Sequence, residues 1–151
     1  MSSDDERIPL ACILPVLERL HLGGVDVTLI AGQAVNFWAN YYKEADPSLL
    51  QFVPFVSKDV DLLGGPKELS RISDFLDGYL IRYRDVRTTL IGTFTTSDDP
   101  PVRIELLRTF HGNLSTQRVI ERRRLLQNIR VIDPVSLLAA KCHNLSGLIK
   151  K

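Results

Sequence analysis

Two segments of the chain alternate apolar and charged residues with a period of two, and this alternation constrains the fold more than any other feature. Residues 58–62 read KDVDL, and residues 102–106 read VRIEL. Successive side chains of a β-strand point to opposite faces of the sheet. Each segment therefore predicts a strand with one apolar, buried face and one charged face. The charged faces carry Asp59 and Asp61 in the first segment and Glu105 in the second.

The rest of the chain predicts an α/β (α+β) domain in which helices flank a mixed β-sheet. Apolar residues at helical spacing and short β-branched runs define the elements. Residues 44–57 predict a loop with a short helical turn, and residues 118–126 fit either a short helix or irregular chain. We expect Trp38, Tyr41 and Tyr42 to pack their helix against the sheet. The expected helices cover residues 9–22, 33–42, 66–76 and 134–148, and the expected strands cover residues 25–31, 58–63, 79–83, 88–95 and 102–107.

Length and composition predict one domain over residues 1–151, with a loose polar lead-in at residues 1–7. The chain is 44% hydrophobic with a net charge of +1, which does not favour broad electrostatic binding of nucleic acid. It has no apolar run of 18 residues, so we expect no membrane span. Cys12 and Cys142 lie in apolar helical stretches. We expect them to be buried thiols, which predicts a reducing compartment, the cytoplasm.

The carboxylates of the two alternating segments are the candidate functional groups. If the strands are neighbours, Glu105 stands beside Asp59 and Asp61, and the like charges favour a compensating cation. Mg²⁺ and Mn²⁺ prefer such hard oxygen ligands, so three carboxylates predict a metal site for phosphoryl transfer. Two alternatives remain open. Arg103 could simply pair with Glu105 on a solvated face, or the acids could belong to an unrelated sheet whose two strands are not adjacent.

A second candidate feature is the turn at residues 29–34, LIAGQA, where a strand runs into a helix. The first turn of a helix has unpaired N–H groups and a partial positive charge, which together can hold a phosphate. Gly32 would let a ligand approach the backbone closely. The alternative is an ordinary strand-to-helix turn without a ligand.

Taken together, these segments resemble the nucleotidyltransferase superfamily, which has the polymerase-beta-like fold. The resemblance covers roughly residues 25–145 and is closest to the bacterial minimal, abortive-infection-toxin-like branch. That family combines a glycine turn at a helix start, an Asp-x-Asp strand, a third acid on a later strand and, in this branch, a helix carrying a lysine. The matching segments here are residues 31–35 (AGQAV), 58–62 (KDVDL), 103–106 (RIEL) and 133–141 (DPVSLLAAK).

The resemblance implies a metal-dependent transfer of a nucleotide from a nucleoside triphosphate to an acceptor, which could be protein, RNA or a small molecule. Asp59 and Asp61 would bind Mg²⁺ or Mn²⁺, and Glu105 would be the third ligand and help to activate the acceptor hydroxyl. Gly32 and Gln33 would hold the terminal phosphates. The toxin-like branch also implies an antitoxin-like partner in a bacterial cytoplasm.

The chain also departs from the family pattern. Ala31 replaces the first glycine of the turn, and Gln33 replaces the family's serine. Lys141 would reach a phosphate as a point charge, or it is a solvated helix lysine. The toxin-like branch usually has a further motif after this helix, whereas this sequence ends at Lys151, so we expect either a shortened chain or a reduced domain. The rival interpretation is a non-catalytic binding or regulatory module with the same fold.

Residues 118–130 are strongly basic. A cluster of arginines can contact the phosphates of an RNA acceptor. The alternative is a solvated helix face balanced by nearby acids. The arginines concerned are Arg118, Arg122, Arg123, Arg124 and Arg130.

Overall fold

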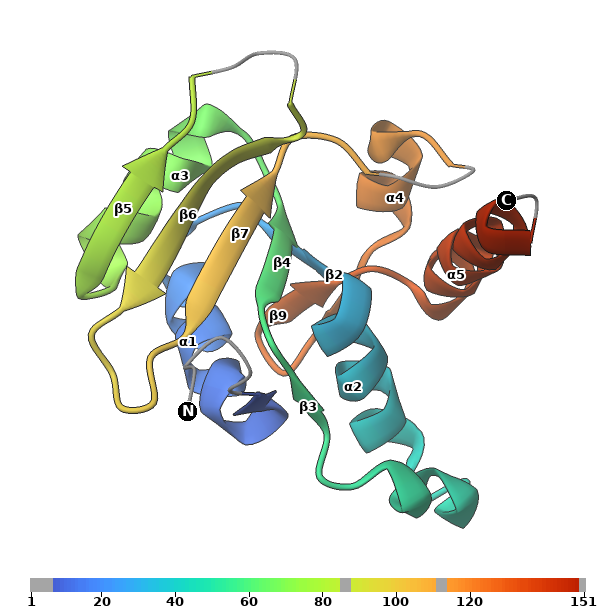
Figure 1. Ribbon diagram of the computed structural model, residues 1–151. Coiled ribbons are helices and arrows are strands. Elements are labelled where there is room, and N and C mark those ends of the chain that lie inside the picture. The colour runs from blue at the N-terminus through green and yellow to red at the C-terminus, as the bar shows by residue number, and fades with distance from the viewer. Residues whose placement is uncertain (1–6, 85–87, 111–113, 150–151) are drawn as a thin grey trace.

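A mixed β-sheet with helices packed against it forms the core of the computed structural model, which describes residues 7–84, 88–110 and 114–149. The helices are α1 (Leu10–Leu22), α2 (Ala31–Tyr42), the 3₁₀ helix η2 (Pro47–Phe52), α3 (Pro66–Phe75), α4 (Thr116–Arg122) and α5 (Pro134–Ile149). The strands are β1 (Ile8–Pro9), β2 (Thr28–Ile30), β3 (Val56–Ser57), β4 (Val60–Leu63), β5 (Gly78–Arg82), β6 (Leu90–Thr96), β7 (Arg103–Leu107), β8 (Arg124–Leu126) and β9 (Ile129–Val131). Figure 1 shows this arrangement.

The main sheet has the strand order β5-β6-β7-β4-β2-β9-β8, and β1 pairs separately with β3. Its pairs β4–β7 and β2–β9 are parallel, and the others are antiparallel. The expected mixed sheet is therefore confirmed. The two alternating segments form β4 and β7, which are direct neighbours. The unrelated-sheet alternative required separated strands, so this pairing does not favour it.

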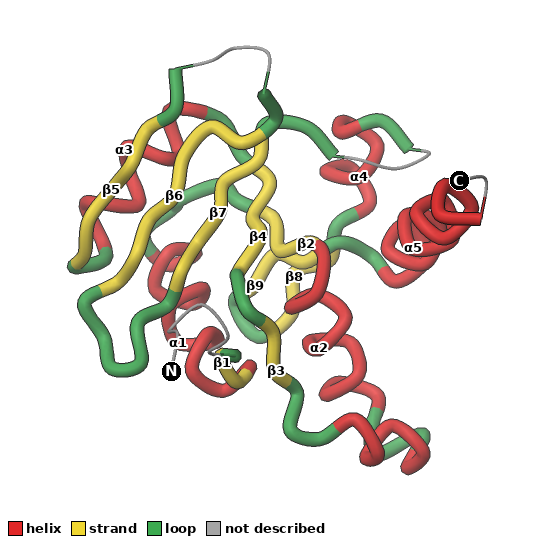
Figure 2. Tube along the Cα trace, viewed as in Figure 1, coloured by secondary structure: helices red, strands yellow, loops and turns green. Residues whose placement is uncertain are grey.

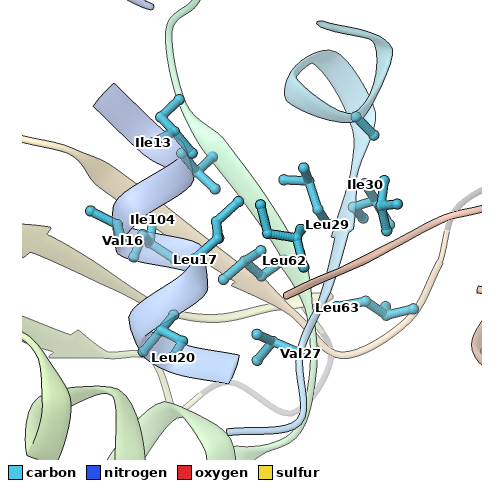
Figure 3. Close-up of a cluster of buried hydrophobic side chains, with 14 of the residues drawn as sticks. Ile13, Val16, Leu17, Leu20, Val27, Leu29, Ile30, Leu62, Leu63 and Ile104 are labelled. Atoms are coloured by element: carbon cyan, nitrogen blue, oxygen red, sulfur yellow. The ribbon is translucent and has the colours of Figure 1, made fainter. Parts of the chain in front are cut away.

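The apolar residues of β4 and β7 form the centre of the hydrophobic core. Val60 and Leu62 on β4 face the same side as Ile104 and Leu106 on β7, and all four are fully buried. Helix α1 presents its own apolar stripe to this face, as Figure 3 shows for Ile13, Val16, Leu17 and Leu20. In Figure 1, α1 and α3 lie behind β5, β6 and β7. These helices cover the face of the sheet that carries Val60 and Ile104. The opposite face is covered in part, since Ile30 and Leu63, which share the face of Asp61, are also buried.

The region that was hardest to interpret from sequence contains a short helix and a hairpin. Helix α4 occupies residues 116–122, and residues 124–131 form the antiparallel pair β8–β9, which extends the sheet as Figure 2 shows. Gln127 and Asn128 make the turn with φ values of 54° and 61°. A two-residue hairpin turn requires such left-handed conformations, and asparagine tolerates them better than most residues. The sequence expectation missed this hairpin.

Helix α2 is only partly buried, which corrects one expectation. Trp38 packs inside and its indole Nε1 donates a hydrogen bond of 2.8 Å to the carbonyl oxygen of Ile132. Tyr41 and Tyr42 instead remain 47% and 44% exposed and contact the Trp38 ring from outside. The helix has 12 residues, and only one stripe of it can face the core.

Both cysteines are exposed free thiols, so the expectation that they are buried is wrong. Cys12 lies on α1, where Ile13, Val16, Leu17 and Leu20 occupy the inward positions and leave Cys12 on the outer side. Cys142 is likewise exposed on α5. Among the helices that the structure describes, none is both long enough and apolar enough to cross a lipid bilayer.

The Trp38 hydrogen bond predicts a measurable contribution to stability, because it joins α2 to the chain between β9 and α5. Trp38→Phe removes the donor to a carbonyl group in a buried contact, so we expect the free energy of unfolding to fall by about 1–3 kcal/mol. Urea denaturation followed by circular dichroism measures this change. Tyr41→Phe is the control and should change stability by less than about 0.5 kcal/mol. Equal effects of the two substitutions would contradict the assignment.

Candidate functional site

The predicted acidic residues lie on adjacent strands at one place in the sheet. In the parallel pairing of β4 with β7, Asp61 lies directly opposite Glu105, and Val60 lies opposite Ile104. Directly opposite residues of neighbouring strands point to the same face. Asp61 and Glu105 therefore lie on the charged face of the sheet. Asp59 immediately precedes β4 and follows the same alternation.

An arginine lies between two of these acids. The Nε atom of Arg103 is 3.7 Å from Oδ1 of Asp59, and its Nη2 atom is 3.6 Å from Oε1 of Glu105. The pair between Arg103 and Glu105 was one of the alternatives open from the sequence, whereas the contact between Arg103 and Asp59 was not expected. The parallel strand pairing brings Asp59 within reach of Arg103, and this pairing is not visible in the sequence of either segment alone.

These ion pairs are loose. Both distances exceed the 2.7–3.2 Å of a well-formed N–H···O hydrogen bond. The Arg103 side chain is 52% exposed, whereas Asp59 and Glu105 are 26% and 25% exposed. Exposed pairs of this kind each contribute about 0–1 kcal/mol to stability. Arg103 is therefore a weakly held counter-ion of Asp59 and Glu105.

The carboxylates do not form a metal centre in the arrangement described. Within residues 7–84, 88–110 and 114–149, no three His, Cys, Asp or Glu side chains are grouped so that they could hold a metal ion. Asp59 and Glu105 are instead directed toward Arg103. The backbone places oxygen donors of the right chemistry side by side, but a metal ion would require their side chains to reorient.

The turn at the start of α2 lies against the same part of the sheet. Ile30, the last residue of β2, pairs with Asp61, so α2 begins beside the carboxylates. Gly32 approaches strand β3, which follows later in the chain, closely: a Cβ atom at Gly32 would lie 2.9 Å from the Ser57 hydroxyl oxygen. Ile30 is the N-cap residue and provides no side-chain hydrogen bond to the first turn of α2. This helix start is therefore not capped by its own N-cap residue.

Ala31 adopts a conformation that suits glycine. Its φ angle is 61°, in the left-handed region where a Cβ atom crowds the backbone. Ala31 is the position at which the nucleotidyltransferase pattern has its first glycine. The alanine therefore stores strain at this point.

Gln33 is anchored inside the protein. Its side chain is fully buried, its Nε2 atom donates a hydrogen bond of 3.2 Å to the Ile8 carbonyl oxygen, and its Oε1 atom accepts one of 3.0 Å from Asn36. The side chain therefore joins the start of α2 to β1. A contact between Gln33 and a phosphate would have to come from its backbone N–H group.

The remaining candidates lie away from this cluster or outside the description. Lys141 belongs to α5, but its side chain lies outside the described part of the structure. In the basic stretch, Arg123 and Arg130 form ion pairs within the protein. Their Nη1 atoms lie 2.6 Å and 3.5 Å from Oδ1 of Asp26. These two arginines fit the structural alternative better than an RNA-binding patch.

A cavity of about 230 Å³ lies at the other end of β4 from Asp59. None of the residues predicted from the sequence to form the site lines it. Its walls carry both signs of charge, and two of its charged residues, Arg123 and Asp26, already pair with each other. We assign it no function. The lining residues are Asp26, Leu63, Gly64, Gly65, Glu68, Arg108, Thr116, Ile120 and Arg123.

The strain at Ala31 gives a test of the turn geometry. Ala31→Gly removes a left-handed strain of about 1–2 kcal/mol and adds about 0.5–1 kcal/mol of chain entropy to be lost on folding. We expect a net stabilisation of about 0.5–1 kcal/mol, measured by urea denaturation. Ala34→Gly, three residues along α2 at a buried position, is the control and should destabilise by at least about 1 kcal/mol. The account is wrong if both substitutions destabilise equally.

Comparison with known proteins assigns no family to the chain. Family models, curated proteins and solved structures all gave no match. The chemistry of the site is therefore inferred from three local features: the paired strands β4 and β7, the uncapped start of α2, and the arginine between the acids.

Proposed function

We propose that the chain is a nucleotidyltransferase-like domain that transfers a nucleotide from a nucleoside triphosphate to an acceptor. The observation that carries the proposal is the register of β4 and β7, which sets Asp61 opposite Glu105 on one face of the sheet. The start of α2 beside Asp61 supports the proposal, because it brings the N–H groups of a helix start next to the carboxylates.

The proposed cofactor is Mg²⁺ or Mn²⁺, and Asp59, Asp61 and Glu105 would hold it. Three carboxylates are the hard oxygen donors that these ions prefer. When bound, such an ion neutralises charge on the triphosphate and on the leaving pyrophosphate. The ligand set requires rotation of the side chains, since Asp59 and Glu105 lie toward Arg103 in the arrangement described.

The protein's own groups would position the two reactants. The first turn of α2 has N–H groups that its N-cap residue does not cap, and it faces the carboxylate end of the site. Such donors bind terminal phosphates, and Gly32 would contribute through its backbone. The Gln33 amide is occupied by Ile8 and Asn36, so only the Gln33 backbone N–H group enters the proposal. Lys141 is retained as a proposed phosphate contact from α5.

The proposed reaction is an in-line displacement. An acceptor oxygen forms a bond to the α-phosphorus while the bond to the pyrophosphate oxygen breaks, and Glu105 accepts the proton of the acceptor hydroxyl. Positioning and charge neutralisation would provide most of the rate enhancement. The acceptor is a protein, an RNA or a small molecule. An antitoxin-like partner remains a proposal, as does a cytoplasmic location, which two free exposed thiols favour.

A second candidate function is a non-catalytic module with the same fold. Two observations favour it. The Gln33 side chain is committed to the interior, and the described acids form no group that could hold a metal ion. In this alternative, Arg103 permanently neutralises the acids, and the domain binds a nucleotide or a partner without chemistry.

Substitution of the acids separates the two candidates. We expect wild-type protein to bind a nucleoside triphosphate only when Mg²⁺ or Mn²⁺ is present, and Asp61→Asn or Asp59→Asn to weaken that binding at least about tenfold. Asp74→Asn is the control, because Asp74 is an exposed carboxylate on α3, behind the sheet. Isothermal titration calorimetry with each of the four nucleoside triphosphates measures affinity, and pyrophosphate release measures turnover.

Two results would decide against catalysis. Equal cation-dependent binding by wild type, Asp59→Asn and Asp61→Asn removes the metal-site assignment. Nucleotide binding without pyrophosphate release, tested with protein, RNA and small-molecule acceptors, favours the non-catalytic module.

A further inference from the structure

We infer that β5 is a dimerisation edge, at which it pairs antiparallel with β5 of a second copy of this chain. Strand β5 is an end strand of the seven-stranded sheet and has β6 on one side. Among the described residues, no strand pairs with its other side, which lies at the margin of the sheet in Figure 1. This edge is separate from the proposed nucleotide site, because β6 lies between β5 and β7.

The outer edge of β5 presents backbone groups that no other strand of the described chain uses. In an antiparallel pair, only alternate residues bond to the neighbouring strand. The Tyr83 N–H group donates to the carbonyl oxygen of Ile91, so the odd-numbered residues of β5 bond to β6. The even-numbered residues therefore point their N–H and C=O groups away from the sheet, where they can act as a template for another strand. These residues are Gly78, Leu80 and Arg82.

Strand β5 lacks the usual protection of an edge strand. Natural edges are commonly blocked by lysine, proline or a β-bulge. The β5 sequence is GYLIR, and its register with β6 is continuous. Its one charged side chain, Arg82, lies toward α3, where its Nη2 atom is 2.6 Å from the Ser70 hydroxyl oxygen. The other edge strand, β8, has three residues, whereas β5 has five.

Exposed apolar side chains follow one face of β5 and its extension. Tyr79, Ile81 and Tyr83 alternate along the chain and are 61%, 45% and 40% exposed. In a two-fold antiparallel pair centred on Leu80, Tyr79 of each copy lies opposite Ile81 of the other. Pairs of an aromatic and a β-branched side chain across two strands stabilise a sheet. Dimerisation would therefore cover apolar surface that the monomer leaves in water.

The register centred on Leu80 uses the whole of β5. It matches the outward-pointing residues of the two copies, because Leu80 lies opposite Leu80 and Gly78 lies opposite Arg82. Gly78 has no side chain and leaves room for the arginine of the other copy. A pair centred on Arg82 would instead bring two guanidinium groups together, which like charges disfavour.

Charge favours the antiparallel arrangement over a parallel one. Two exposed carboxylates, Asp74 and Asp77, lie near the start of β5. Two exposed arginines, Arg82 and Arg84, lie at its other end. Antiparallel pairing sets the acidic end of each copy beside the basic end of the other, whereas parallel pairing would set like charges together. The edge is therefore complementary to itself, as a two-fold interface requires.

The molar mass of the full chain, measured by light scattering over a range of concentrations, tests this inference. One strand pair is a small interface, so we expect a concentration-dependent equilibrium between monomer and dimer. Ile81→Lys replaces one member of each Tyr79–Ile81 pair with a charge. It should weaken the dimer at least about tenfold, since symmetry makes the loss occur twice.

The matched control is Leu125→Lys on β8. Leu125 is also an apolar residue on an edge strand and is 55% exposed. We expect this variant to dimerise as wild type does. Circular dichroism verifies that both variants are folded.

Cross-linking tests the register. With Cys12→Ser and Cys142→Ser removing the two native thiols, Leu80→Cys should form an intermolecular disulfide on mild oxidation. Directly opposite residues of a hydrogen-bonded pair have Cα atoms about 5.5 Å apart, within the range of a disulfide. Arg82→Cys in the same background is the control, because four residues of offset place it about 14 Å from its own copy.

Three results would overturn the inference. Wild type that remains monomeric at about 1 mM does not pair with a second copy, and its edge is then open only to another protein. An unchanged dimer in folded Ile81→Lys means that the copies associate through a different surface. Equal cross-linking of Leu80→Cys and Arg82→Cys contradicts the register, and this comparison decides the matter if Ile81→Lys does not fold.

Discussion

The parallel pairing of β4 with β7 is the constraint on which the rest of the site depends. It buries Val60 and Ile104 on one face, and by the same register it sets Asp61 beside Glu105 on the other. Neighbouring strands lie about 5 Å apart. At such a separation, two like charges repel by about 1 kcal/mol in water and by several times that near a protein surface. Like charges placed this close favour a counter-ion, and Arg103 lies 3.6 Å from Glu105 and 3.7 Å from Asp59.

The same register connects the acids to the start of α2. Because β2 pairs with β4, the chain leaves the sheet at Ile30, next to Asp61, and turns into the helix through the strained Ala31. The buried amide of Gln33 then fixes the first helical turn to β1. The helix start, the acids and the arginine are thus positioned by backbone pairing, while the side chains of Asp59, Glu105 and Arg103 remain partly exposed.

The sequence predicted those parts of the fold in which local pattern and tertiary environment agree. The period-two alternation located β4 and β7, and helical spacing located α1, α2, α3 and α5. The β8–β9 hairpin escaped prediction because its strands are three residues long, its turn contains no glycine, and Leu125 is exposed, so the alternation is weak. The exposure of Cys12 could not be read from residue type, since the other α1 residues fill the inward stripe.

Prediction of the site was limited because the pairing of strands that are distant in the chain is not visible in local sequence patterns. The sequence indicated which acids share a face, but contact between Arg103 and Asp59 depends on which strands are neighbours. The central claim is that these acids hold a divalent ion beside a nucleoside triphosphate, and the most direct measurement is an anomalous difference map at the manganese edge from crystals soaked with Mn²⁺ and a non-hydrolysable nucleoside triphosphate analogue. The account predicts a manganese peak among Asp59, Asp61 and Glu105. Crystals that bind the analogue without such a peak, with Arg103 still between Asp59 and Glu105, would contradict it.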